Sequence, residues 1–205
     1  MNKVIKVFGC LCLMVCMLAG CGKVTLPENF ANTSLIVNED GTITYWLVDD
    51  FDKDYYKVSE LKDMATKEAV EFSVSFKEEG AATAAEVDKV LTLAEDPSKI
   101  AVVYTFSGGK SFARFTDTTF FYGTVGDAYK NGYELKGKIA AVKGNSTMSD
   151  LELKQQTKDH LIITDLKIPI YLTEKAVYVS PGAVVTEDGY VDLSNVSGTA
   201  FILLK

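Results

Sequence analysis

The last third of the chain is a succession of short strand-like runs, and this pattern constrains the fold more than any other feature. The runs are rich in β-branched and aromatic residues and are bounded by turn-forming residues. Because no helix-length segment separates them, the βαβ alternation of a parallel sheet is missing, and we expect antiparallel strands. Pro169 cannot donate to a strand ladder, so it predicts an edge strand or a bulge. The runs cover residues 160–164, 167–172, 176–179, 184–186, 190–193 and 199–204.

Two Asp-Gly dipeptides predict tight hairpins. Asp40-Gly41 lies between two β-rich runs in residues 35–48, and Asp188-Gly189 has the same position in residues 183–193. Glycine readily adopts the positive φ angle that a tight hairpin requires. Three further strands are predicted at residues 87–93, 99–106 and 135–143, the first two separated by Asp96-Pro97.

The remaining periodic segments predict a few amphipathic helices. Between Ser59 and Phe76, apolar residues recur at spacings of three, four and seven, with Ser59 as the expected N-cap. Residues 110–116 predict a short helix with its two phenylalanines inward, and Thr124 begins a capping box before another helical turn. We therefore expect an α+β fold over residues 35–205: one globular domain in which a few amphipathic helices pack on an antiparallel β-sheet with a β-rich C-terminal third.

The first 21 residues have the organisation of an export signal. Lys3 and Lys6 form a basic start, residues 7–18 form an apolar run too short to span a membrane, and Leu18-Ala19-Gly20-Cys21 follows. This tetrapeptide resembles the bacterial lipobox. The resemblance implies that residues 1–20 are a signal peptide that is removed, and that Cys21 carries a thioether-linked diacylglycerol and is open to a further N-acyl chain such as palmitate. An uncleaved apolar anchor or an ordinary signal cut elsewhere is the alternative, and both would also export the chain.

Processing at this site would leave a body without reactive cysteine. Cys10, Cys12 and Cys16 lie in the apolar run and would leave with it, while the sulfur of Cys21 would be bonded to lipid. The mature protein would then have no disulfide, no thiolate nucleophile and no cysteine metal site. No cofactor is expected beyond the covalent lipid on Cys21.

The charge of the chain argues against polyanionic partners. The 21 basic and 28 acidic residues give a net charge of −7, and the loss of two lysines with the signal peptide would make it −9. A nucleic-acid partner needs a basic face, and anionic lipid headgroups would repel this chain. Anchoring would therefore depend on the acyl chains, of which two contribute on the order of 20 kcal/mol. We expect residues 21–34 to form a flexible tether that reaches at most ~45 Å, holding the domain on the extracytoplasmic face of the cell membrane.

Sequence motifs identify no catalytic residue and no metal ligand. The chain lacks the glycine loops, nucleophile elbow and zinc-protease motif of common enzyme classes. His160 is the only histidine, and one imidazole cannot supply the three or four ligands that zinc needs. We expect His160 to be a hydrogen-bonded or solvent-facing residue at a strand end, the alternatives being a general base or a pH sensor.

An acidic cluster has part of the spacing of a calcium loop. Asp50, Asp52 and Asp54 match its first three ligand positions, but Tyr55 stands where the turn needs glycine and Leu61 where a bidentate glutamate belongs. The alternative is that these carboxylates are hydrated and favoured by the positive end of the helix that follows. The sequence leaves cation binding open.

Adjacent aromatic residues offer a second candidate feature. Three clusters stand out among ten tyrosines, eleven phenylalanines and one tryptophan: Tyr55-Tyr56, Tyr45-Trp46 and residues 120–122. Aromatic side chains fill cores and cover sheet faces, and they also form binding surfaces for sugars and peptides. In a strand, adjacent side chains point to opposite faces, so at most half of them could meet a ligand.

Three segments carry a resemblance to a bacterial lipoprotein family. Residues 51–61, 112–115 and 121–133 look like recurring features of lipoproteins from Gram-positive anaerobes, a family without an assigned activity. The resemblance covers about half of the mature chain. It implies display on the membrane surface and supplies no catalytic residues.

These observations favour a membrane-anchored binding or assembly module over an enzyme. The expected partner is an envelope protein, peptide or glycan, contacted by a face that bears tyrosines and acidic residues. One alternative is a carboxylate-based hydrolase of envelope material, which requires two acids with separated pKa values in a cleft. The other alternative is the solute-binding component of a transporter, although 185 mature residues are few for two lobes.

Overall fold

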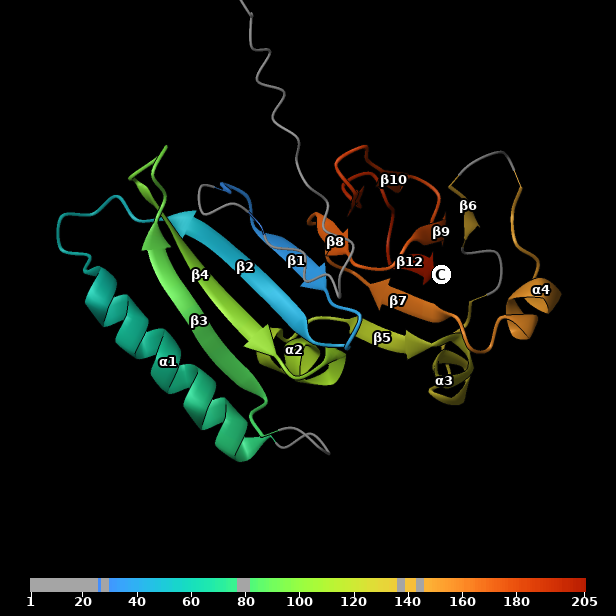
Figure 1. Ribbon diagram of the computed structural model, residues 1–205, viewed down its shortest axis with the longest axis horizontal. Coiled ribbons are helices and arrows are strands. Elements are labelled where there is room, and N and C mark those ends of the chain that lie inside the picture. The colour runs from blue at the N-terminus through green and yellow to red at the C-terminus, as the bar shows by residue number, and fades with distance from the viewer. Residues whose placement is uncertain (1–25, 27–29, 77–81, 136–138, 143–145) are drawn as a thin grey trace, which may run out of the picture.

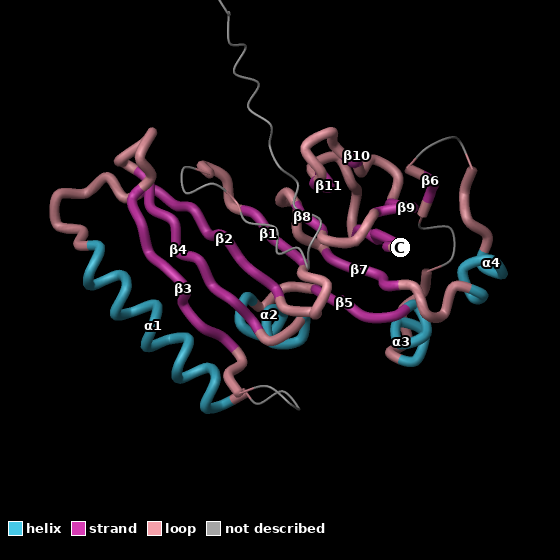
Figure 2. The backbone as a smooth tube through the Cα atoms, viewed as in Figure 1, coloured by secondary structure: helices cyan, strands magenta, loops and turns pink. Residues whose placement is uncertain are grey.

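Two β-sheets carry four helices in the part of the chain that the computed structural model describes (Figure 1). That part comprises residues 26, 30–76, 82–135, 139–142 and 146–205. Figure 2 shows one long helix beside the long strands at one end of the molecule and two short helices at the opposite end. The predicted α+β class with a β-rich C-terminal region is confirmed.

The larger sheet has seven strands. It orders them β10-β11-β8-β1-β2-β4-β3, and every neighbouring pair is antiparallel except β1 and β8, which are parallel. The Asp40-Gly41 hairpin is confirmed, with Gly41 at a φ of 83° between β1 and β2. The strands are β1 (Ser34–Val37), β2 (Ile43–Asp50), β3 (Ala85–Thr92), β4 (Lys99–Phe106), β8 (Ile170–Leu172), β10 (Val184–Val185) and β11 (Tyr190–Asp192).

The smaller sheet has five antiparallel strands in the order β5-β7-β12-β9-β6. Its central strand, β12, is buried along its whole length. The strands are β5 (Phe120–Thr124), β6 (Ala140–Ala141), β7 (His160–Thr164), β9 (Ala176–Val179) and β12 (Ala200–Leu204).

The long helix covers one face of the larger sheet. Ala65 and Ala69 are its buried residues, and their small side chains let the helix lie close to the strands. The three short helices connect strands, and α3 begins at the Thr124 cap as predicted. The helices are α1 (Val58–Ser75), α2 (Gly109–Thr116), α3 (Val125–Lys130) and α4 (Asp150–Gln155).

The two faces of the larger sheet are buried by different parts of the chain. Along β4, Val102 and Tyr104 pack into the core that contains Ala65 and Ala69 of α1, whereas Ala101 and Val103 pack into a separate cluster on the opposite face. We call the face of the sheet that packs against α1 the helix face, and the opposite face the arm face. This alternation follows from the two-residue period of a strand.

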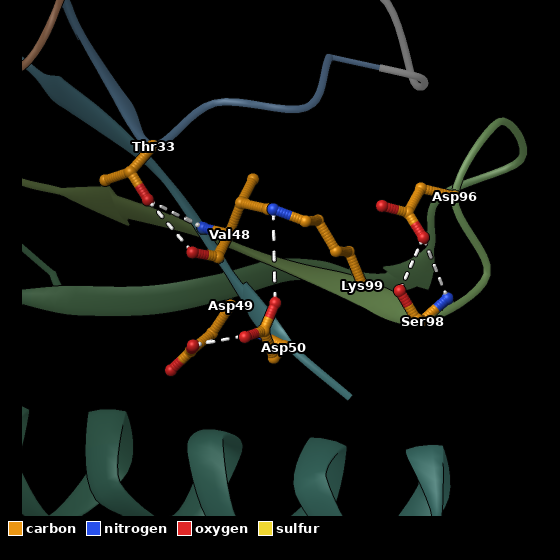
Figure 3. Close-up of polar contacts among 7 residues, drawn as sticks. All are labelled: Thr33, Val48, Asp49, Asp50, Asp96, Ser98 and Lys99. Atoms are coloured by element: carbon orange, nitrogen blue, oxygen red, sulfur yellow. Dashed lines mark hydrogen bonds and ion pairs between the residues drawn. The ribbon is translucent and has the colours of Figure 1, made fainter. Parts of the chain in front are cut away.

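The arm face is covered by the segment before β1. Leu26 is 5% exposed and packs with Trp46, and the carbonyl of Phe30 accepts a hydrogen bond from the Trp46 indole nitrogen at 2.9 Å. Thr33 Oγ1 donates to the carbonyl of Val48 and accepts from its amide, at 3.1 and 3.0 Å (Figure 3). We call Leu26 and residues 30–33 the N-terminal arm. This part of the segment that we expected to be a free tether belongs to the domain.

Several local predictions need correction. Ser59 is not the N-cap of α1, because the helix begins at Val58 and Lys57 occupies the cap without a side-chain hydrogen bond. Pro169 marks neither an edge nor a bulge: it precedes β8, which lies inside the sheet between β11 and β1, and its carbonyl accepts from the Leu35 amide at 3.0 Å. Of the strand predicted at 135–143, the described residues form only β6.

The export signal lies outside the described residues. Residues 1–25, including Cys21, are not among them, so signal cleavage and lipid attachment remain predictions. None of the described helices is long and apolar enough to cross a membrane.

Candidate functional site

A groove opens between the first turns of α1 and the ends of β2 and β4. It has a volume of about 410 Å³, within the range of small-ligand pockets. The groove brings Asp50 of the acidic cluster, with its neighbour Asp49, together with the tyrosine pair that the sequence singled out separately. Its lining residues are Leu47, Asp49, Asp50, Phe51, Tyr55, Tyr56, Lys57, Glu60, Leu61, Met64, Ile100 and Val102.

Strand pairing builds the floor of the groove. Leu47 lies opposite Val102, and Asp49 lies opposite Ile100, in the antiparallel register of β2 and β4. Directly opposed residues share a face, so three aliphatic side chains, of which Ile100 and Val102 are buried, and one carboxylate point to the helix face together. Figure 3 shows Asp49 and Asp50 where β2 ends, near the turns of α1.

The turn between β2 and α1 supplies the aromatic wall. The amide of Tyr56 donates to the Lys53 carbonyl at 2.9 Å, which folds the chain back before the helix starts. The ring of Tyr56 lies 5.1 Å from that of Phe51 and 4.9 Å from that of Tyr55, measured between centroids. Tyr55 is 72% exposed and Met64 is 68% exposed, so this wall offers large apolar side chains to solvent.

Carboxylates outnumber ammonium groups along the lining. Asp49, Asp50 and Glu60 face one lysine, Lys57, whose Nζ lies 2.7 Å from Glu60. Asp50 lies 4.0 Å from another cation, Lys99 (Figure 3). The groove is therefore apolar at its floor and negative at its rim.

Three ionisable groups beside the groove, Asp52, Lys53 and Tyr56, have shifted pKa values. A hydrogen bond from Lys53, at 2.8 Å, lowers the pKa of Asp52 below its ordinary value. The neighbouring phenol of Tyr55 raises the pKa of Tyr56, which stays protonated at neutral pH. Asp52 therefore remains ionised and Tyr56 remains neutral at neutral pH.

The structure does not assemble the calcium-like acids into a cation site. Asp52 pairs with Lys53, and Asp50 lies near Lys99 and donates its amide to Asp49 Oδ1 at 2.8 Å. Among all described residues, no three His, Cys, Asp or Glu side chains are grouped so that they could hold a metal ion. The one-three-five spacing of Asp50, Asp52 and Asp54 thus comes from an exposed turn.

A second polar cluster surrounds His160 at the start of β7. His160 Nδ1 lies 2.8 and 2.9 Å from the two carboxylate oxygens of Glu174, and the Tyr122 hydroxyl donates to Glu174 at 2.7 Å. Because the carboxylate only accepts, Nδ1 carries the proton. Burial, followed by the bond to Glu174, raises the pKa of Tyr122. His160 is thus hydrogen-bonded, as the simpler interpretation of this residue requires.

Sequence reasoning missed Tyr122 and Glu174 as partners of His160. Tyr122 is 38 residues from His160 and Glu174 is 14 residues from it. They meet because β5 pairs with β7, which starts at His160, and because the chain after β8 places Glu174 beside that residue. No local motif marks such a contact. That the chain has no catalytic residue and no metal ligand stays a prediction.

Two other hollows are larger, but the chemistry of their linings points less clearly to a ligand. One, of about 600 Å³, runs between α1 and β3 and is lined mostly by alanine, valine, serine and threonine; Glu86 is the only ionisable residue among the described residues that line it. The other, of about 570 Å³, lies beside Tyr133, Ser180 and Phe201 at the smaller sheet. Neither combines exposed aromatic rings with a set of like charges, so the groove at the start of α1 is the better candidate.

Comparison with protein-family models, with curated proteins and with solved structures finds no match to this chain.

Proposed function

We propose that the protein is a lipid-anchored extracytoplasmic binding module whose groove at the start of α1 takes a peptide segment that carries positive charge beside apolar side chains. The anchor follows from the Leu18-Ala19-Gly20-Cys21 sequence. The observation that carries the binding role is the exposed tyrosine pair standing over an acidic, apolar-floored groove. A module of this kind binds or assembles with another envelope protein without transforming it.

The chemistry of the groove supports this ligand class. A lysine or arginine side chain gains from the carboxylates of Asp49 and Asp50 and from the faces of Tyr55 and Tyr56, which attract cations. Its aliphatic stem, or a neighbouring apolar residue, fits the floor of Leu47, Ile100 and Val102. An anionic ligand would meet three carboxylates and one ammonium group.

Peptide titration tests the proposal. The processed, lipidated protein in neutral detergent is titrated with short fluorescent peptides that alternate lysine with leucine, and with matched peptides that alternate glutamate with leucine. We expect only the lysine peptides to bind. Removal of one ring in Tyr56→Ala should weaken binding by about fivefold, which corresponds to ~1 kcal/mol.

A matched variant distinguishes binding in the groove from nonspecific hydrophobic binding elsewhere on the surface. Leu151 is 68% exposed and belongs to α4, far from α1 in Figure 1, so Leu151→Ala should leave the affinity unchanged. Equal binding of both peptide sets, or equal losses in Tyr56→Ala and Leu151→Ala, would contradict the proposed site. Binding of neutral glycans in place of the lysine peptides would favour a sugar-binding module, and hydrolysis of the peptides would favour an enzyme.

A further inference from the structure

We propose that the arm face of the larger sheet is turned toward the bilayer, so that the groove at the start of α1 opens away from the membrane. The inference rests on the proposed lipid anchor at Cys21. It assigns a membrane-facing surface to the domain and makes the groove accessible to partners in the envelope.

The first step is the place where the chain from the anchor joins the domain. Leu26, five residues after Cys21, is 5% exposed in the cluster formed with Trp46 and Leu93 on the arm face. Phe30 continues the attachment through its carbonyl bond to Trp46 and through a ring contact with Tyr171 at 5.7 Å. The connection to the lipid therefore leaves from one known face of the sheet.

The second step is that the groove lies on the other face. Trp46 and Val48 of β2 point to the arm face, whereas Leu47 and Asp49, which alternate with them, line the groove. In β4, Ala101 and Val103 join the arm cluster while Ile100 and Val102 line the groove. The sheet itself separates the two surfaces.

The third step compares lengths. Five residues extend over at most ~18 Å, so Leu26 stays within that distance of the lipidated cysteine. Layers pack ~10 Å apart, so the axis of α1 lies about 20 Å from the arm layer, and half the thickness of a helix puts its outer surface at about 25 Å. Turning α1 onto the bilayer would therefore require a longer connection than five residues provide, whereas the arm face is within easy reach.

Charge favours the same orientation. On the side of the groove, Asp49 and Glu60 line the hollow and Asp52 lies in the turn beside it, and anionic headgroups repel such a surface at close range. On the arm face, Asp50 lies opposite Lys99, whose Nζ is 4.0 Å from its carboxylate, and Lys89 Nζ lies 5.5 Å from the centroid of the Trp46 ring. The repulsion acts on the groove side and adds to the constraint of the short connection.

Site-specific fluorophores test this orientation. The mature chain has no free cysteine once Cys21 is lipidated, so Asn32→Cys on the arm and Asp63→Cys on α1 each give a single labelling site; both native residues are exposed. Lipidated protein is reconstituted in phosphatidylcholine vesicles that contain a headgroup-linked quencher. We expect the label at position 32 to be quenched several-fold more strongly than the label at position 63. Equal quenching, or stronger quenching at position 63, would overturn the inference.

Two controls distinguish failure of the orientation from failure of the anchor. The intact mass of each labelled protein must show the acyl chains on Cys21, and protein without them that does not bind vesicles would refute the anchor instead. A long Gly-Ser insertion between Gly22 and Leu26 keeps the lipid but removes the length limit, so it should reduce the difference between the two labels. An unchanged difference in this variant would show that chain length does not set the orientation.

Discussion

The indole nitrogen of Trp46 donates a hydrogen bond of 2.9 Å to the backbone carbonyl of Phe30, sixteen residues earlier. This bond ties the segment that follows Cys21 to the middle of β2. Trp46 is 2% exposed beneath this segment and is the only tryptophan in the chain. Its fluorescence therefore reports whether the N-terminal arm is in place.

Truncation of Leu26 should loosen the arm. In Leu26→Ala we expect the free energy of unfolding to fall by about 2 kcal/mol, because a buried side chain is lost, and the Trp46 emission to shift to longer wavelength. Denaturant unfolding followed by circular dichroism and fluorescence measures both effects. The exposed Leu151→Ala should change stability by less than ~0.5 kcal/mol. Unchanged stability and emission in Leu26→Ala would show that the arm does not pack on the sheet in solution.

Tyr104 should make the protein lose stability in alkaline solution. Burial, with a smaller contribution from Glu68, raises the pKa of Tyr104 to about 12, whereas the unfolded phenol titrates near 10. A folded pKa above the unfolded one favours the protonated form, so its stabilising effect is complete below pH 10 and is lost as the pH rises from 10 to 12. The slope for one such group approaches ~1.4 kcal/mol per pH unit.

The matching variant is Tyr104→Phe, which removes the titrating hydroxyl from a residue that is 5% exposed. Unfolding free energies measured between pH 8 and pH 12 should decline less steeply in this variant than in the parent protein. Parallel curves would mean that Tyr104 does not contribute to the alkaline transition.

Glu174 should hold the imidazole of His160. Its carboxylate accepts hydrogen bonds from both Tyr122 and His160 Nδ1. Glu174→Gln replaces these charge-assisted bonds with weaker ones, so we expect the free energy of unfolding to fall by ~1–3 kcal/mol. Because the chain has one histidine, the Nδ1 proton resonance is assigned without ambiguity, and it should move upfield in the variant. Glu187→Gln, at an exposed position, is the control. A resonance that stays in place would argue against the Glu174 bond.

Gly182 should be the least replaceable glycine of the C-terminal region. Its φ is 90°, and a Cβ atom there would lie 2.4 Å from the Asn195 carbonyl oxygen, which belongs to backbone and cannot move aside. Gly132 has a φ of 81° but open space around the same atom. At both positions alanine should lower the free energy of unfolding by ~1–2 kcal/mol, because its backbone disfavours the left-handed region. The close contact at Gly182 should make the total loss in Gly182→Ala clearly larger. Equal melting temperatures for the two variants would contradict the close approach.

Local chemistry was enough to predict most elements of the fold. The Asp40-Gly41 and Asp188-Gly189 hairpins, the helix after Tyr56 and the boundaries of β7 and β9 follow from turn residues and apolar periodicity alone. Another helix, α4, was missed although its signal is present: Ser149 and Glu152 form a reciprocal capping box. Its six residues are too few to show a helical period, so only the cap could have identified it.

The contacts that local reasoning could not supply are those between distant strands. Three contacts depend on how the two sheets order their strands: the parallel pairing of β1 with β8, the packing of Leu26 against Trp46, and the hydrogen bonds among Tyr122, His160 and Glu174. The groove is an intermediate case. Its tyrosines and acids were recognised individually, but their meeting over Leu47 and Val102 required the register of β2 and β4.

The intact mass of the protein extracted from its native membrane tests the account most directly, because both the binding role and the orientation depend on the anchor. The account predicts a chain that begins at Cys21, without residues 1–20, and that carries the added mass of a diacylglycerol, with or without a further acyl chain. A mass equal to the unprocessed chain, or to a chain cut at another residue without lipid, would contradict it.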